Sequence, residues 1–259
     1  MRMTLNNIMK LVGGIALMTT LNGCAYADEG NTQVTDQPAS SDTGASRTAE
    51  EAAVEAQFEP LFEFLAAEKK DFSNVSTFIS RISIIDKTII NEVKTETGSV
   101  IAENNNVIEE NRLLLKKSDT ESQVFSGYFN ERLNEQGLKY NEEGVKYDVR
   151  LVENEIVFEN TTSEKFISDL YFPIVATTDI KKGIVTSFSK DHPETELTTL
   201  SYDLNPGIPI VQKLLSSYDN QEEVRSVVLN LSKSGNSEFR AIFTVYLSDK
   251  SISLSVNLK

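Results

Sequence analysis

The chain has 259 residues, of which 39 are Asp or Glu and 25 are Lys or Arg, so its formal net charge is −14. Such a charge repels nucleic-acid backbones and anionic lipid headgroups, which argues against a nucleic-acid-binding protein and against a basic membrane-binding surface. The single cysteine, Cys24, excludes an intrachain disulfide, and the single histidine, His192, leaves little basis for histidine-dependent catalysis or zinc binding.

Residues 1–23 are typical of a secretory signal segment. Two basic residues, Arg2 and Lys10, precede an apolar run from Leu11 to Leu21. This run of about eleven residues is too short to cross a bilayer, which needs about 20 apolar residues in a helix. The segment therefore predicts export of the chain and no transmembrane helix.

The segment ends in Leu21-Asn22-Gly23-Cys24, which resembles the lipobox of bacterial lipoproteins. In that family Leu21, Asn22 and Gly23 would be signal-peptidase recognition positions, and cleavage would leave Cys24 as the acylated first residue. Asn22 departs from the small apolar or hydroxyl residue that is usual at its position. Each buried acyl methylene contributes about 0.8 kcal/mol, so several acyl chains anchor a protein stably. The resemblance implies an envelope protein attached to the bilayer through acylated Cys24. Ala25 is similar to the residue that follows the cysteine in lipoproteins sorted to the outer membrane of diderm bacteria. In a diderm host the protein would then lie on the periplasmic side or the surface of the outer membrane.

A second cleavage site follows directly. Ala25-Tyr26-Ala27 has the small-x-small pattern of ordinary signal cleavage, which would instead release a secreted soluble protein starting at Asp28. Residues 24–47 are rich in Ser, Thr, Asp and Gly and hold few apolar residues. Such a segment buries too little surface to offset the entropy of ordering it, so it predicts a disordered tether.

Residues 48–137 predict a helical hairpin or a three-helix segment. Thr48 and Glu51 have the spacing of a capping box and start the first helix. Apolar residues three or four apart predict further helical structure over 73–117, as one long helix or two, and over 118–137. The apolar seam is narrow, which suits a coiled-coil-like packing within the chain or between chains.

From residue 138 onward the hydrophobic period changes to two, which predicts strands. The expected strands are 145–151, 156–158, 169–177, 184–188, 196–204, 208–215, 224–231, 239–247 and 252–258. Short strands separated by turns predict an antiparallel β-sandwich over 138–259. The Asn160-Thr161-Thr162 turn, the run 167–175 and the turn within 202–207 resemble immunoglobulin-like modules of bacterial surface lipoproteins. The predicted fold class is therefore α+β, with a helical segment followed by an immunoglobulin-like sandwich.

Motifs for catalysis and for cofactor or metal binding are not found. His192 lies in a polar loop before Pro193, and adjacent acids such as Glu109-Glu110 and Glu142-Glu143 lie in polar segments. We therefore predict no catalytic, cofactor-binding or metal-binding residues, and interpret the chain as a non-enzymatic binding module for an envelope protein or a cell-wall component. The alternatives are a structural spacer that associates through its helices and a hydrolase that uses two acids.

Overall fold

The structure is a computed structural model that describes residues 46–86, 91–94, 100–103, 107–118, 124–133, 144–192, 196–218, 222–235 and 237–259. Residues 42–259 form one compact unit. The predicted signal segment 1–23, the lipidation site Cys24 and the tether up to residue 45 lie outside the described residues.

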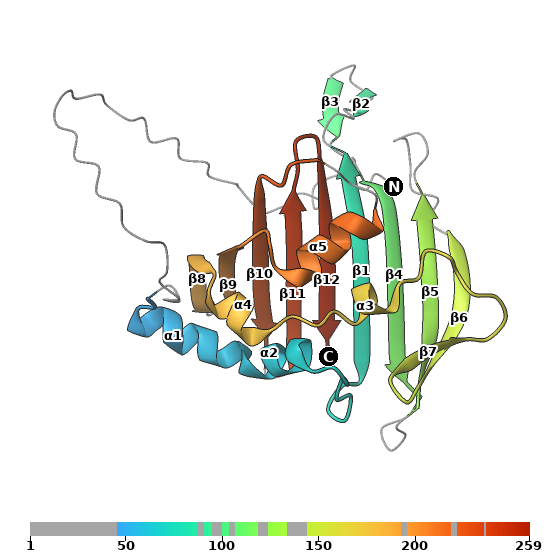
Figure 1. The fold of residues 1–259 in the computed structure, drawn as a ribbon, viewed down its shortest axis with the longest axis horizontal. Coiled ribbons are helices and arrows are strands. Elements are labelled where there is room, and N and C mark those ends of the chain that lie inside the picture. The colour runs from blue at the N-terminus through green and yellow to red at the C-terminus, as the bar shows by residue number, and fades with distance from the viewer. Residues whose placement is uncertain are drawn as a thin grey trace, which may run out of the picture. The chain divides into compact units, whose positions relative to one another are not determined.

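The unit is built on an antiparallel sheet of ten strands (Figure 1). In order across the sheet these are β7 (Glu155–Phe158), β6 (Val145–Val152), β5 (Phe125–Leu133), β4 (Val107–Lys117), β1 (Thr77–Asp86), β12 (Lys250–Leu258), β11 (Glu238–Tyr246), β10 (Ser226–Ser234), β9 (Leu197–Leu204) and β8 (Ile184–His192). A separate pair joins β2 (Asn91–Lys94) to β3 (Val100–Glu103). Because β1 pairs with β12, the sheet joins the early and the late parts of the chain at its centre.

The helices are short and lie on one face of the sheet (Figure 1). They are α1 (Ala49–Glu55), α2 (Glu59–Ala66), α3 (Ser168–Tyr171), α4 (Thr177–Lys181) and α5 (Pro209–Ser217), and a 3₁₀ turn at Ala56–Phe58 connects the first two. The capping box expected at the start of α1 is present. The Thr48 side chain accepts a hydrogen bond from the Glu51 backbone N at 3.2 Å, and the Thr48 backbone N donates to Glu51 Oε2 at 2.7 Å.

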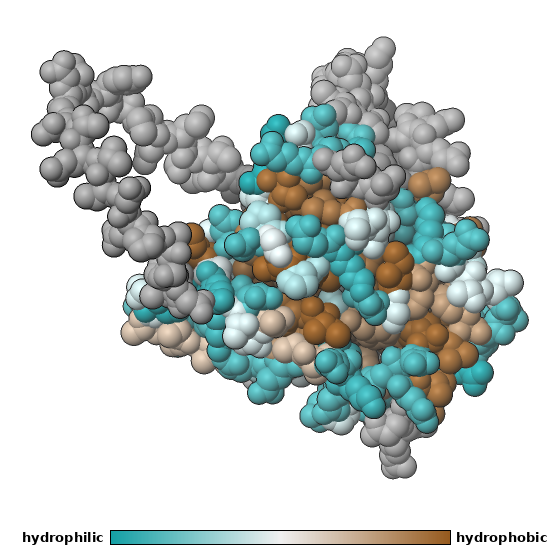
Figure 2. Space-filling model, viewed as in Figure 1, coloured by the Kyte–Doolittle hydropathy of each residue, from teal (hydrophilic) through white to brown (hydrophobic). Residues whose placement is uncertain are grey.

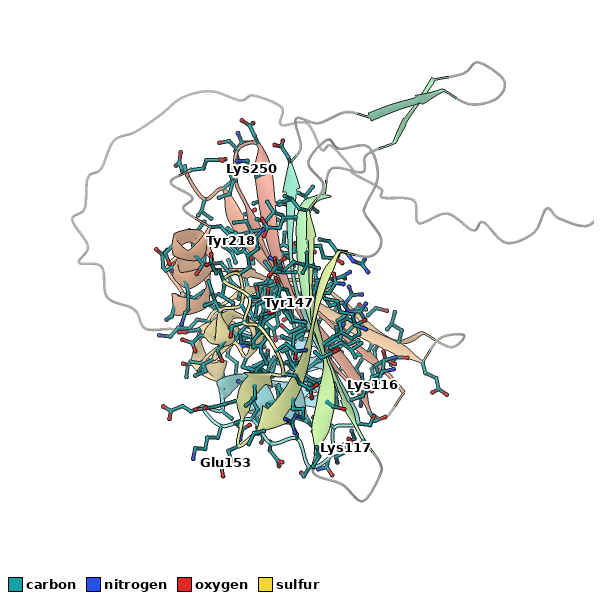
Figure 3. The ribbon with its side chains drawn as sticks, turned by 90° about the vertical axis from the view of Figure 1, so that its right-hand side faces the viewer. Lys116, Lys117, Tyr147, Glu153, Tyr218 and Lys250 are labelled. Carbon is teal, nitrogen blue, oxygen red and sulfur yellow. The ribbon has the colours of Figure 1, made fainter. Side chains whose placement is uncertain are left out.

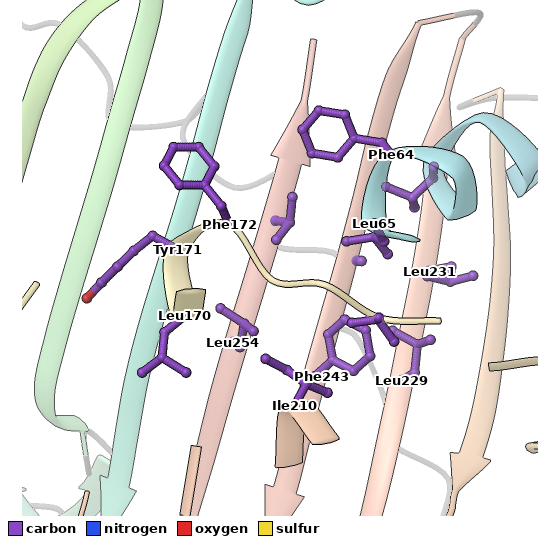
Figure 4. Close-up of a cluster of buried hydrophobic side chains, with 14 of the residues drawn as sticks. Phe64, Leu65, Leu170, Tyr171, Phe172, Ile210, Leu229, Leu231, Phe243 and Leu254 are labelled. Carbon is purple, nitrogen blue, oxygen red and sulfur yellow. The ribbon is translucent and has the colours of Figure 1, made fainter. Parts of the chain in front are cut away.

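An apolar core fills the space between these helices and the sheet (Figure 4). Alternate residues of β1 point into this core, and among them Phe78 and Ile82 are buried. The Phe78 ring stacks on that of Phe172, with centroids 5.2 Å apart, and meets the Phe72 ring edge-on at 5.5 Å. Stacked and edge-on aromatic pairs each add about 0.5–1.5 kcal/mol beyond the area that they bury, so these rings attach the loops to the sheet.

The helical prediction for residues 73–137 is wrong where the structure describes this region. Thr77–Asp86, Val107–Lys117 and Phe125–Leu133 are strands of the large sheet. Apolar residues four apart, such as Phe78 and Ile82, satisfy a strand period of two as well as a helical period of 3.6. The β-branched isoleucines of β1 then favour the strand. The boundary predicted at residue 138 also does not separate two units, because β5 and β6 are neighbours in one sheet.

The antiparallel β-structure predicted for the C-terminal part is confirmed, with two corrections. Residues 169–177 and 208–215, expected as strands, hold α3, the start of α4 and most of α5. Pro209 stands in the first turn of α5, where a missing N–H costs no hydrogen bond. The sandwich expected over 138–259 requires two stacked sheets, whereas the strands described there belong to one sheet that helices cover.

Candidate functional site

The two faces of the large sheet differ in what covers them. The helices and the apolar core lie on one face, which we call the covered face. The other face, which we call the open face, takes the odd-numbered residues of β1 and β12 and the even-numbered residues of β4, β5, β6, β10 and β11. No described helix packs on it. In Figure 3, Tyr218 lies beside the helices, while Lys116 of the open face lies on the opposite side of the sheet.

Four arginines gather on the central strands of the open face. We call Arg81, Arg112, Arg132 and Arg240 the arginine cluster. Arg81 on β1 and Arg112 on β4 are direct register partners. Glu110 is the acid among them. Its carboxylate accepts from Arg81 Nη1 at 3.2 Å and lies 3.7 Å from Arg132 Nη1. Within the described part of the chain, Arg112 and Arg240 form no ion pair, so the one carboxylate compensates two of the four guanidinium groups.

Several polar atoms beside the arginine cluster lack hydrogen-bond partners. Arg240 Nε, Asn257 Oδ1 and Ser255 Oγ are buried and unpaired within the described residues. Asn257 stands opposite Arg240 in the register, and Ser255 stands opposite Arg81. Burial lowers the pKa of Arg240, and the neighbouring Arg81 guanidinium lowers it further. Unpaired donors and acceptors next to uncompensated cations are the features expected of a surface that receives a polar, anionic ligand.

On the covered face, two carboxylates, those of Glu109 and Glu131, accept hydrogen bonds from other segments. Glu109 Oε1 accepts hydrogen bonds from Lys165 Nζ at 2.9 Å and from Asn111 Nδ2 at 2.8 Å. Glu131 accepts a hydrogen bond from the Ser163 hydroxyl. These contacts attach the segment after β7 to the sheet, and they explain both carboxylates as structural acceptors.

A pocket of about 310 Å³ opens on the covered side, between the start of α5 and the segment that joins α3 to α4. Its lining is mainly apolar and includes Ile174, which is 49 % exposed. Hydrophobic residues remain visible between the covering elements in Figure 2. The charged residues at its rim include Lys213 and Asp169, which pair with each other. The pocket therefore offers less unsatisfied polar chemistry than the arginine cluster does.

Most of the residues that the sequence singled out are not described by the structure. Leu21, Asn22, Gly23 and Cys24 lie outside the described residues, and His192 is the last residue of β8. In the described ranges, no group of three or more His, Cys, Asp and Glu side chains is placed to bind a metal ion, and no helix is long and apolar enough to cross a membrane. No known family model and no curated protein matches the chain.

The sequence did not reveal the arginine cluster. In a helix over 73–117, Arg81 and Arg112 would lie far apart, whereas the antiparallel pairing of β1 with β4 places them side by side. The signal that could have found the surface is the alternation along β1, where Arg81 and Ser83 occupy every second position between the buried residues.

Proposed function

We propose that this chain is a lipid-anchored, non-enzymatic binding protein of the bacterial envelope and that the open face is its binding surface. The observation that supports the binding surface best is the arginine cluster, in which Glu110 pairs with Arg81 and Arg132 while Arg112 and Arg240 form no ion pair within the described residues. The anchor rests on the lipobox resemblance at Cys24. Residues 145–259 resemble immunoglobulin-like modules, and this resemblance supports the proposal that the protein binds its partner through the surface of a sheet.

The two alternatives have less support. The spacer hypothesis relied on helices over 73–137 that would associate between copies, and the described parts of that region belong to a sheet. The hydrolase hypothesis needs two acids that are free to act on a substrate. In the pair Glu109-Glu110, Glu109 accepts hydrogen bonds from Lys165 and Asn111, and Glu110 pairs with Arg81 and Arg132. Glu142-Glu143 lies outside the described residues. Cleavage after Ala27, which would release a secreted soluble protein, remains the competing hypothesis for the location of the protein.

The anchor is tested by fractionating cells that express Cys24→Ser. We expect this variant to leave the membrane fraction, because the acylated thiol is lost. Asn22→Ala is the matched control, since it changes a lipobox position to a small residue and should stay in the membrane. A Cys24→Ser protein that remains membrane-bound would contradict the lipid anchor.

The binding surface is tested by photo-crosslinking in cells. A photoreactive residue replaces Ser253, which lies half-buried on the open face of β12, or Glu63, which is exposed on α2. We expect a high-mass adduct from position 253 and none from position 63. Equal crosslinking from the two positions, or crosslinking from position 63 alone, would rule out the open face as the binding surface.

A further inference from the structure

The open face is positively charged although the protein is strongly acidic. Along β1, β4, β5, β6, β11 and β12, its basic residues are Arg81, Arg112, Lys116, Arg132, Lys146, Arg150 and Arg240. The acids on the same strands of this face are Glu110, Asp148 and Glu238, and Glu238 pairs with Lys259 at the strand ends, at 2.9 Å. Arg150 pairs with Glu159, which follows β7, at 3.2 Å. A chain with a net charge of −14 thus concentrates cations on one flat surface.

Part of this charge opposes folding. Arg81 and Arg112 face each other directly across neighbouring strands, about 4.8 Å apart in the sheet, and like charges in such pairs are destabilising. Glu110 contacts Arg81 and Arg132 but forms no ion pair with Arg112. The pair is therefore neutralised incompletely within the described residues, and an external anion would relieve the repulsion.

A row of small polar side chains runs beside these cations. The open face of β12 carries Ser251, Ser253, Ser255 and Asn257, spaced about 6.8 Å apart because alternate residues of a strand share a face. Ser253 already bonds to Thr244, with the two hydroxyl oxygens 3.1 Å apart. Ser255 Oγ and Asn257 Oδ1 are buried and have no hydrogen-bond partner among the residues that the structure describes. Hydroxyl and amide groups of this kind exchange hydrogen bonds with hydroxyl groups of a ligand.

The shape of the surface selects an extended ligand. The arginine cluster lies across the strands of a sheet rather than in a cavity, and from β11 to β5 the strands span about 19 Å at 4.8 Å per strand. A compact anion would contact one or two guanidinium groups at a time. A linear chain with repeated anionic groups can contact Arg240, Arg81 and Arg112 together.

The charge distribution disfavours a flat anionic membrane. Asp148 on β6 and Asp203 on β9 stand on the open face, on strands to either side of the arginine cluster, and a bilayer that covered the face would meet these carboxylates too. The exposed large hydrophobic residues of the open face, Val152, Val157 and Ile184, lie on β6, β7 and β8, outside the strands that carry the arginine cluster. A narrow, hydroxyl-bearing polyanion can contact the arginine cluster without reaching Asp148 or Asp203.

We propose that the arginine cluster and the polar row of β12 bind an acidic polysaccharide. Its anionic groups receive charge-assisted hydrogen bonds from Arg81, Arg112 and Arg240, and its sugar hydroxyls face the half-buried Ser253 and Asn257 of the polar row. This inference rests on the proposed function, since it names the class of ligand for the same surface.

The experiment uses the full chain with Cys24→Ser, so that acylation at this position does not contribute. Binding to immobilised alginate, a carboxylated polysaccharide, and to heparin, a sulfated one, is compared with binding to neutral dextran. The test variant is the triple substitution Arg81→Gln, Arg112→Gln and Arg240→Gln. The control removes the same charge on the covered side with Lys69→Gln, Lys181→Gln and Lys213→Gln.

We expect the parent protein to bind at least one acidic polymer and not dextran, and the arginine variant to bind at least about tenfold more weakly, because three charge-assisted contacts are lost. The lysine control should bind like the parent, and urea unfolding monitors the folding of both variants. The proposal is overturned if the parent binds neither acidic polymer or if both triple variants lose binding equally.

Two further outcomes separate this inference from the proposed function. Arginine-dependent binding to vesicles of phosphatidylcholine and phosphatidylglycerol, with no binding to the polymers, would overturn the polysaccharide and leave the open face as a lipid-binding surface. Loss of the cellular crosslink at position 253 in the arginine variant, again without polymer binding, would indicate an acidic protein partner and would overturn only the ligand class.

Discussion

The covered and open faces belong to the same strands, yet the cationic side chains on them differ in how completely they are paired. On the covered side, Arg47 pairs with Glu55 at 2.9 Å and also donates to the carbonyl oxygen of Gly183 at 2.8 Å. Lys70 is almost completely buried there, and its Nζ donates to the carbonyl oxygens of Phe64, Leu65 and Pro173 at 2.8–3.0 Å. Each of these cations has neutral or acidic partners that attach one segment to another.

On the open face, Arg112 and Arg240 have no such partners among the described residues, and Arg81 shares one carboxylate with Arg132. The alternation of side chains allows one strand to serve both purposes, because successive residues point to opposite faces. The comparison shows that the covered face holds the contacts that stabilise the fold, and it supports the proposal that the open face binds a ligand. Substitutions at neighbouring positions of one strand can test this division.

The largest expected effect is that of Phe78→Ala on the covered face. Its side chain is fully buried against the rings of Phe64, Phe72 and Phe172, so the substitution leaves a cavity and should lower the free energy of unfolding by about 3–5 kcal/mol. The matched control is Ile79→Ala, one residue along on the open face, which should cost less than about 1.5 kcal/mol because Ile79 is only half-buried. Urea unfolding measures both, and equal losses would contradict the division between the two faces.

Lys70→Met should cost about 2–3 kcal/mol of unfolding free energy, because three carbonyl oxygens lose a charged donor and remain buried. Lys69→Met, at the exposed neighbouring position, should change stability by less than about 0.5 kcal/mol. Urea denaturation at neutral pH measures both variants. Indistinguishable midpoints would show that Lys70 does not stabilise the end of α2.

Lys70 should also make the free energy of unfolding depend on pH. Burial lowers the pKa of Lys70 from 10.5 to about 8, so between these values the unfolded chain binds more protons than the folded one. Stability then rises with pH across this window. Measured from pH 8 to pH 10, the free-energy difference between the parent and Lys70→Met should therefore grow in favour of the parent. A difference that stays constant with pH would contradict the lowered pKa.

The parts of the fold that sequence could predict are those with local signals. The capping residues Thr48 and Glu51 predict the start of α1. The alternation of apolar and polar residues in 239–247 and 252–258 predicts the last hairpin. The pairing of β1 with β12 joins segments far apart in the sequence and has no local signature. The arginine cluster depends on that pairing and on the register of β1 with β4, so the site was not predictable from the sequence even where its residues were visible.

The smallest expected effect concerns the cation pair itself. Arg112→Gln removes one of two guanidinium groups that face each other across β1 and β4, so it should raise the free energy of unfolding by about 0.5 kcal/mol at low salt. Lys116→Gln removes the same charge from the same face of β4, but it stands opposite Thr77 rather than a cation and should give no gain. Screening shortens the range of the repulsion to about 3 Å at 1 M salt, so the difference between the two variants should vanish there. Urea midpoints at low and high salt provide the test. An Arg112→Gln variant that is less stable than Lys116→Gln would mean that the arginine supports the fold, and that the open face, like the covered face, is built for stability.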